Sequence, residues 1–175
     1  MATARCIITN PTTFDPTPPL TPPRIRDESG VTVPRLGNIV ELRDTDTAVT
    51  FSVPVDDEGT TDLLQWKLFI NVDRECRTQE GAACDPWRHG EVPSNQRVRR
   101  IIDGISIPES RFATGCNRVE LWVSSRFQFA GDSHEPTREG DVDFATWWVF
   151  KPARGGSGDG GVVDPIESCA YRVQP

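Results

Sequence analysis

Apolar side chains recur at every second position in three runs of this chain, at residues 49–55, 64–72 and 118–123. A period of two is typical of half-buried β-strands, in which successive side chains point to opposite faces. No window of about 11 or more residues carries the apolar stripe of an amphipathic helix, and proline or glycine interrupts nearly every candidate. The sequence therefore predicts an all-β fold whose helices are at most single turns.

Weaker apolar runs bring the expected strands to about seven, and they lie at residues 36–42, 101–107, 144–150 and 162–173. Short strands with one apolar face must stack sheet on sheet to cover that face, which favours a β-sandwich. Trp66 in mid-run, a later run that ends at residues 107–108 (Ile-Pro), and a strand from Cys116 follow the order of strands C, E and F in an immunoglobulin-like sandwich. Residues 49–55 lack the cysteine of antibody domains. We therefore expect an immunoglobulin/fibronectin III-like β-sandwich over residues 35–152, with Trp66 between its sheets.

The two ends of the chain differ in composition from its middle. Residues 9–23 hold six prolines among threonines, and residues 155–161 hold five glycines. Proline cannot donate to a sheet ladder, so a Pro-rich segment is either an extended tether or a cover on a sheet edge. We expect residues 1–34 to take one of these two forms, and residues 153–175 to be a Gly-rich linker followed by a C-terminal strand.

The charge balance excludes some partners. The 175 residues include 19 Lys and Arg against 26 Asp and Glu, a net charge of −7. Non-specific nucleic-acid binding depends on clustered basic residues, so no nucleic-acid partner is expected. No run approaches the roughly 20 apolar residues of a transmembrane helix, and a chain of this length can build a core without a cofactor. The one basic cluster, Arg97, Arg99 and Arg100, is expected to guard an edge strand against aggregation.

Five cysteines indicate disulfide bonds rather than a metal site. They show no C-x-x-C spacing, and the chain has only two histidines. Cys76 and Cys84 bracket a short loop of small and charged residues, so we predict a bond between them. We predict a second bond between Cys116 and Cys169, with Cys6 to Cys169 as the alternative and five reduced cysteines as the other possibility. Disulfides indicate an oxidising, extracytoplasmic compartment.

Tryptophans supply the best binding signal in the sequence. Trp147 and Trp148 are adjacent, so their side chains must face opposite sides of a strand. Trp122 alternates with the apolar residues of its run and is expected to face outward. An exposed aromatic patch on a domain surface can mark recognition of a sugar, a peptide or a protein. We name Trp122, Trp147 and Trp87 as the candidate patch; the alternative is that the Pro-rich segment or the C-terminal tail covers it.

Catalytic and metal-binding signals are weaker. His89 and His134 each lie near a carboxylate, but neither has a nucleophile or triad around it, so we expect no enzyme. A loop with several carboxylates can hold calcium, although solvated acidic side chains are commoner and the spacing matches no EF-hand. The residues of this calcium alternative are Asp132, Glu135, Glu139, Asp141 and Asp143.

Three segments together resemble a known group of proteins. They are the Pro-rich stretch after Cys6, residues 115–127 (Gly-Cys-Asn-Arg-Val-Glu-Leu-Trp-Val-Ser-Ser-Arg-Phe) and residues 145–149 (Ala-Thr-Trp-Trp-Val). In this combination the chain resembles the uncharacterised surface lipoproteins common in myxobacteria. The resemblance implies a lipid anchor on the first mature cysteine, for which Cys6 is the matching position. It implies no catalytic residue and no ligand.

The sequence thus favours a non-catalytic surface module in the periplasm or on the outer membrane. Such a module would bind a protein partner or a cell-surface component, or serve a structural role, and would be presented on a Pro-rich stalk. The alternative is a carbohydrate-binding module that stacks a glycan on its exposed tryptophans. A hydrolase is the third and least favoured hypothesis.

Overall fold

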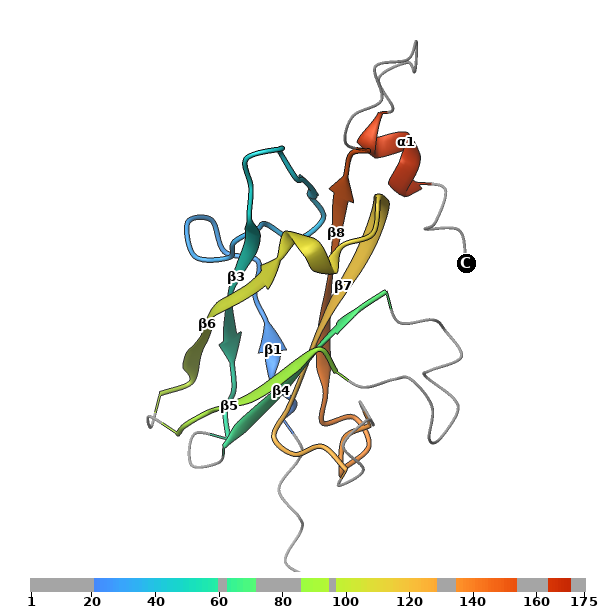
Figure 1. Ribbon diagram of the computed structural model, residues 1–175. Coiled ribbons are helices and arrows are strands. Elements are labelled where there is room, and N and C mark those ends of the chain that lie inside the picture. Colours follow the sequence, from blue (N-terminus) through green and yellow to red (C-terminus); the bar gives the residue numbers. More distant parts are fainter. Residues whose placement is uncertain are drawn as a thin grey trace, which may run out of the picture.

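Two β-sheets face each other in the computed structural model, which describes residues 21–59, 63–71, 86–94, 97–128, 135–153 and 164–170 (Figure 1). The three-stranded sheet has the order β1-β3-β6, and the five-stranded sheet has the order β2-β8-β7-β4-β5. All pairs are antiparallel except β2 with β8. The strands are β1 (Arg24–Ile25), β2 (Ile39–Glu41), β3 (Ala48–Asp56), β4 (Leu64–Ile70), β5 (Arg88–Val92), β6 (Arg99–Pro108), β7 (Gly115–Ser124) and β8 (Asp143–Lys151). The prediction of an all-β sandwich is confirmed.

The core lies between the sheets and follows the period-two pattern. In β3 the alternating side chains of Phe51, Val53 and Val55 are fully buried, and in β4 Leu64 and Leu68 face them. Trp66 is 9% exposed and belongs to the same core cluster, which confirms its predicted place between the sheets. The strands expected at 36–42, 49–55, 64–72, 101–107, 118–123 and 144–150 are therefore present, the first of them as the three-residue β2, whereas β1 and β5 were not expected.

Trp147 is a core residue, which corrects the prediction that it belongs to an exposed patch. Its side chain is fully buried, its ring meets Phe51 edge to face at 5.1 Å, and its Nε1 donates to the Pro34 carbonyl at 2.8 Å. Register explains this, because Trp147 lies opposite Val119, a core residue of β7. Of the two adjacent tryptophans, Trp148 therefore faces outward.

The described part of the Pro-rich segment covers a sheet edge. Arg24 and Ile25 pair with the end of β3, and the Arg26 amide donates to the Pro54 carbonyl at 2.9 Å. Val33 then forms an isolated bridge with Ser52. Residues 24–33 therefore lie along the edge of the three-stranded sheet; residues 1–20, which hold most of the prolines of the N-terminal segment, lie outside the described part of the chain.

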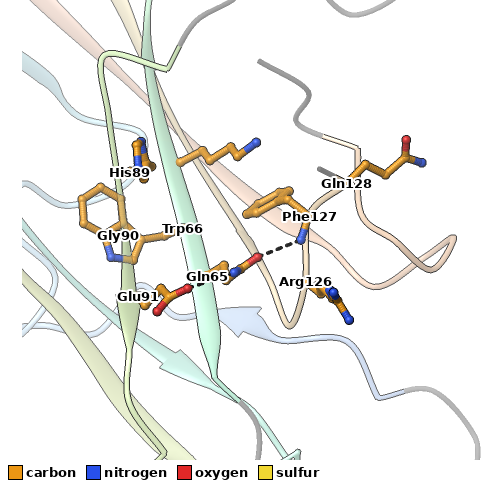
Figure 2. A pocket seen from close by; sticks show the side chains of 9 residues that line it. Gln65, Trp66, His89, Gly90, Glu91, Arg126, Phe127 and Gln128 are labelled. Atoms are coloured by element: carbon orange, nitrogen blue, oxygen red, sulfur yellow. Dashed lines mark hydrogen bonds between the residues drawn. The ribbon is translucent and has the colours of Figure 1, made fainter. Parts of the chain in front are cut away.

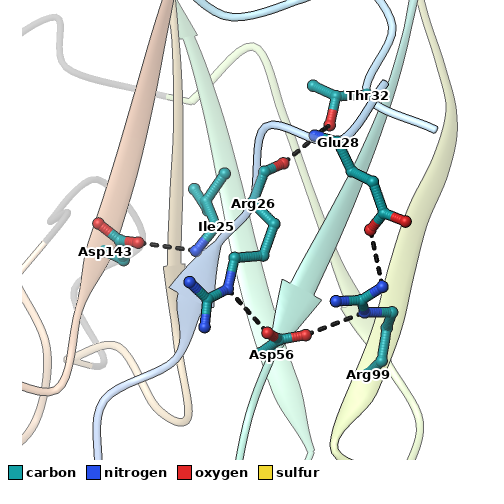
Figure 3. A network of polar contacts seen from close by, with 7 residues as sticks. All are labelled: Ile25, Arg26, Glu28, Thr32, Asp56, Arg99 and Asp143. Atoms are coloured by element: carbon teal, nitrogen blue, oxygen red, sulfur yellow. Dashed lines mark hydrogen bonds and ion pairs between the residues drawn. The ribbon is translucent and has the colours of Figure 1, made fainter. Parts of the chain in front are cut away.

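Charged side chains fasten this segment to the three-stranded sheet (Figure 3). Asp56 accepts from the Arg26 Nε at 2.7 Å and from the Arg99 Nε at 3.1 Å, and Arg99 also reaches Glu28 at 2.7 Å. The hydrogen bond from Arg99 lowers the pKa of the Asp56 carboxyl; desolvation opposes this shift, and Arg26 adds to it. Asp56 therefore joins the N-terminal segment to both β3 and β6.

We expect Asp56→Asn to destabilise the protein by about 1 kcal/mol at pH 7, since paired surface charges contribute modestly. A lowered folded-state pKa stabilises the fold above the unfolded-chain value of about 3.9. The difference from the parent should therefore shrink below that pH and vanish once the pH passes the lowered pKa of Asp56. Urea denaturation across the acid range measures this. Asp103→Asn, exposed on β6, serves as the control, and a pH-independent difference would contradict the prediction.

Arg100 does not guard an edge, which corrects the grouping of three arginines. β6 is an edge strand, and Arg97 and Arg99 are exposed, but Arg100 points inward and is 1% exposed. Its Nη2 lies 3.1 Å from Asp57 Oδ2 and donates to the Gly59 carbonyl at 2.9 Å. Alternation along the strand accounts for the difference, because neighbouring side chains face opposite sides.

The predicted C-terminal strand is wrong: residues Pro165–Ala170 form a short helix, α1. Asp164 Oδ1 accepts from the Ile166 amide at 2.7 Å, as an N-cap does, and Pro165 occupies the first helical position, where it is favoured. The local Asp-Pro signal thus outweighs the apolar pattern. α1 lies at one end of the molecule, beside the end of β8 (Figure 1).

A disulfide holds α1 against the outer face of the five-stranded sheet. It joins Cys116 of β7 to Cys169 of α1, with Cα atoms 5.3 Å apart. Both cysteines are buried with Phe150, and Trp148 packs against them. Because these cysteines bond each other, the alternative bond from Cys6 to Cys169 is not present. Cys6, Cys76 and Cys84 lie outside the described residues.

We expect a Cys116→Ser, Cys169→Ser double variant to lose about 2–4 kcal/mol of stability, because the bond closes a long loop of the unfolded chain. The sequence separation is 53 residues. Urea denaturation of parent and variant without reductant is the measurement, since a reductant would act on every cysteine of the chain. Superimposable unfolding curves would show that this bond does not constrain the fold.

Candidate functional site

The outer face of the five-stranded sheet has a covered end and an open end. α1 covers the end near Cys116, as described above. At the other end, register places Lys67 of β4 opposite both His89 of β5 and Trp122 of β7, and Trp122 opposite Phe144 of β8. Four strands thus contribute one side chain each to a line across the outer face, in which His89 and Phe144 are exposed, Trp122 is half-buried and Lys67 is buried. We call His89, Lys67, Trp122 and Phe144 the cross-strand row.

Two aromatic rings form the centre and one end of this row. Trp122 and Phe144 stack with ring centroids 4.8 Å apart and planes inclined by 17°. The indole Nε1 donates to Glu120 Oε2 at 3.2 Å, and Phe144 is 50% exposed. The outward position predicted for Trp122 is therefore correct, but its aromatic neighbour is Phe144 and not Trp147.

An open groove of about 290 Å³ lies beside the row on β4 and β5 (Figure 2). Figure 2 shows Gln65 at its centre, between Glu91 and Phe127. The Gln65 amide donates to Glu91 Oε1 at 3.0 Å, and its carbonyl oxygen accepts from the Phe127 backbone amide at 3.0 Å. Lys67 Nζ lies 4.9 Å from the centre of the Phe127 ring. These contacts tie the segment after β7 to β4, next to the edge strand β5. The lining residues of the groove are Gln65, Trp66, Lys67, His89, Gly90, Glu91, Arg126, Phe127 and Gln128.

The core determines the backbone position of β5 at this groove. Gly90 lies opposite Trp66, and a Cβ atom on residue 90 would fall 2.6 Å from the Trp66 ring. Real Cβ contacts are not this short, so a side chain here would displace the ring or the strand. Glycine at this position therefore lets β5 lie against the indole (Figure 2).

The third tryptophan of the predicted patch is elsewhere. Trp87 is half-buried and packs against the main core cluster, and it does not line the groove. Of Trp122, Trp147 and Trp87, only Trp122 therefore lies in the cross-strand row. Four members of this surface were not predicted from the sequence, because no local pattern marks them as surface neighbours of Trp122. They are Phe144, His89, Lys67 and Phe127.

Two carboxylates of the calcium alternative, Asp141 and Asp143, accept hydrogen bonds within the protein, whereas Glu139 is exposed. Asp143 accepts from the Ile25 and Phe144 amides at 2.7 and 2.9 Å, and the buried Asp141 accepts from the Ser125 hydroxyl. Glu135 is exposed, whereas Asp132 lies outside the described residues. In the part of the chain that the structure describes, no three or more His, Cys, Asp or Glu side chains form a group that could hold a metal ion.

The described lining of the groove offers one histidine and one carboxylate but no hydroxyl or thiol side chain. His89 and Glu91 are exposed on β5, and the lining residues include no Ser, Thr or Cys. His134, the other histidine, lies outside the described residues. The groove thus brings together an imidazole, a carboxylate and a guanidinium on neighbouring parts of the sheet.

Comparison with known proteins adds no family to this description. No protein-family model matches the chain, and no curated protein matches it.

Among the described residues, no helix is long and apolar enough to cross a membrane.

Proposed function

We propose that this chain is a non-catalytic interaction module that binds a protein partner or a cell-surface component through the cross-strand row and the adjoining groove. The observation that carries this proposal is Phe144, a large apolar side chain left half exposed beside a stacked indole, at the open end of a sheet face. Exposed aromatic groups are typical anchors of recognition surfaces, where they bury much area at little entropic cost.

The composition of the surface favours a protein partner. Protein interfaces combine an aromatic centre with a polar rim. Here the Trp122–Phe144 stack adjoins a groove edged by His89, Glu91 and Arg126. Charged groups of both signs along the groove would fix the orientation of a partner, whereas the rings would supply most of the affinity.

The strand order supports an immunoglobulin-type fold for the module. In that fold, strands B and E share one sheet and strands C, F and G form the other. β3 and β6 share one sheet here, and β4, β7 and β8 are consecutive neighbours in the second. We assign β3 and β6 to B and E, and β4, β7 and β8 to C, F and G.

The disulfide supports an extracytoplasmic location, at the outer membrane surface or in the periplasm. A bond such as Cys116–Cys169 persists in oxidising compartments and is rare in the cytosol. Since neither cysteine is available to Cys6, we propose Cys6 as the lipid-bearing position that the resemblance to surface lipoproteins implies. Mass spectrometry of the native protein tests this, and an unmodified Cys6 would contradict it.

A carbohydrate ligand is the second candidate, because the same surface places a ring face near amide and carboxylate groups. Sugars stack their C–H faces on aromatic rings and hydrogen-bond through their hydroxyls, and Phe144, Gln65 and Glu91 offer these groups. Binding of a defined glycan by the parent that is lost in Trp122→Ala and Phe144→Ala would favour this candidate over a protein partner.

The test compares two exposed apolar residues on opposite sheets. Phe144 is 50% exposed and Ile101 of β6 is 49% exposed, so they differ in location but not in accessibility. A photo-crosslinking amino acid at each position identifies the bound partner in cells of the source organism. Titration of that partner then measures Kd for Phe144→Ala and Ile101→Ala.

We expect crosslinks from position 144 only, and a Kd raised about tenfold or more by Phe144→Ala, as for a central interface residue. Ile101→Ala should leave the Kd within about twofold of the parent, since rim and remote contacts contribute little. Equal crosslinking from both positions, or equal effects of the two variants, would contradict the proposal.

A further inference from the structure

We propose that two copies of this chain associate through β5, in antiparallel register about Gly90, so that their five-stranded sheets join into one. β5 ends the five-stranded sheet, and among the described residues no strand pairs with its second side. Arg88, His89 and Glu91 are exposed. An edge strand offers unpaired backbone N–H and C=O groups that another strand can extend.

β5 is the least protected of the sheet edges that the structure describes. β1 and β2, at two other edges, are only two and three residues long. β6 is long, but its pairing with β3 shifts register between Phe51 and Val53, and it ends at Pro108. Short strands, bulges, prolines and charged side chains are the usual guards of an edge, and β5 carries only the last of these, in Arg88 and Glu91, whose charges are opposite in sign. The five residues of β5 contain no proline, and their pairing with β4 runs without a register shift.

The sequence of β5 complements itself. In an antiparallel pair centred on Gly90, His89 of one copy lies opposite Glu91 of the second copy, and Glu91 lies opposite the second copy's His89. Both side chains lie on the outer face, because register places them opposite Lys67 and Gln65. An imidazole N–H can donate to the carboxylate, and opposite partners of this kind stabilise cross-strand pairs. The Gln65 hydrogen bond uses Oε1 of Glu91, so Oε2 can take the new contact.

This arrangement would place both binding surfaces on one side of the dimer. Cross-strand neighbours share a face of a sheet. The cross-strand rows of both copies would therefore lie on the same outer surface, related by a two-fold axis through Gly90. A partner with two sites would then bind more tightly than to one copy, through effective concentration. The dimer itself depends only on β5 and does not require the proposed function.

Sedimentation equilibrium of the full chain, from micromolar to millimolar concentration, tests the proposal. A strand pair of this length buries little area, so we expect a weak dimer. His89→Glu sets like charges opposite each other twice per dimer and should raise the dimer Kd about tenfold or more. Ser106→Glu, exposed on β6, adds the same charge elsewhere and should leave the Kd unchanged.

The decisive variant exchanges the two residues, with His89→Glu and Glu91→His in one chain. It has the parent composition and net charge, and it restores opposite partners only if residues 89 and 91 of the two copies face each other. We expect its Kd to return to within about threefold of the parent, because both cross-strand pairs are re-formed. Three results would each overturn the proposal. They are a chain that stays monomeric at every concentration, a dimer Kd that His89→Glu leaves unchanged, and an exchange variant whose dimer Kd stays as high as that of His89→Glu. Dimerisation is measured without the partner, and the Phe144 test keeps the parent residues at positions 89 and 91, so the failure of either proposal can be told from the failure of the other.

Discussion

Replacing Arg100 with methionine is expected to lower the free energy of unfolding by about 3–5 kcal/mol, the cost of breaking a buried ion pair from one side. The Arg100 side chain is fully buried and that of Asp57 is 3% exposed, with Nη2 and Oδ2 3.1 Å apart. Without the guanidinium, the Asp57 carboxylate would keep its bond from the Gly59 amide but would lose its buried counter-charge. Urea denaturation of parent and variant measures the loss.

The adjacent arginine provides a matched control. Arg99 precedes Arg100 in β6 and also contacts carboxylates, but its side chain is 51% exposed. Arg99→Met should cost about 1 kcal/mol or less, because solvent screens exposed pairs. An Arg100→Met, Asp57→Leu double variant should recover much of the loss by removing both charges. Equal effects of the two single arginine variants would contradict the role of burial.

Trp147→Ala is expected to destabilise the protein by about 3–5 kcal/mol, the usual cost of truncating a buried tryptophan. The ring is fully buried between the sheets, so its removal would leave a cavity beside Phe51. It would also leave the Pro34 carbonyl without the indole donor that joins the N-terminal segment to the core. Thermal and urea denaturation check the prediction.

Trp148→Ala tests the assignment of faces, since this neighbour points outward and is only half-buried. We expect it to cost less than half as much as Trp147→Ala, because less apolar area returns to water. Trp147→Phe keeps most of the side-chain volume but removes the hydrogen bond to Pro34. Its loss of stability should therefore lie between those of Trp148→Ala and Trp147→Ala. A larger effect at position 148 than at position 147 would show that the register of β8 is wrong.

Several features of the fold could be predicted because they depend on local patterns. The alternation in residues 49–55 and 64–72 indicated strands whose apolar faces meet, and Trp66 lies where that alternation placed it. The Asp-Pro pair at residues 164–165 was an equally local signal, but the apolar residues that follow it were interpreted as a strand. β1 and β5 were missed because a proline-rich context and a run of charged residues carry no apolar alternation.

The candidate site was predictable only in part. Trp122 could be placed outward from its own strand, because its neighbours Leu121 and Val123 are apolar. Trp147 and Trp148 could not be told apart, since residues 144–150 are apolar at almost every position and either parity is compatible with burial. Phe144 shared this ambiguity, and Trp147 was therefore named beside Trp122 in the candidate patch in place of Phe144.

The sequence by itself determined the long strands β3, β4, β6, β7 and β8, the all-β class and the outward position of Trp122, because side-chain alternation is a property of each strand alone. Only the tertiary structure decided which of two adjacent arginines is buried. It also decided that Asn117 is buried, where its Oδ1 accepts a hydrogen bond from the Ala113 amide at 2.9 Å. It also decided the cross-strand row, whose members come from four strands far apart in the chain. The physical reason is that register between strands is set by the packing of whole sheets, and a shift of one residue would turn every side chain of a strand to the other face.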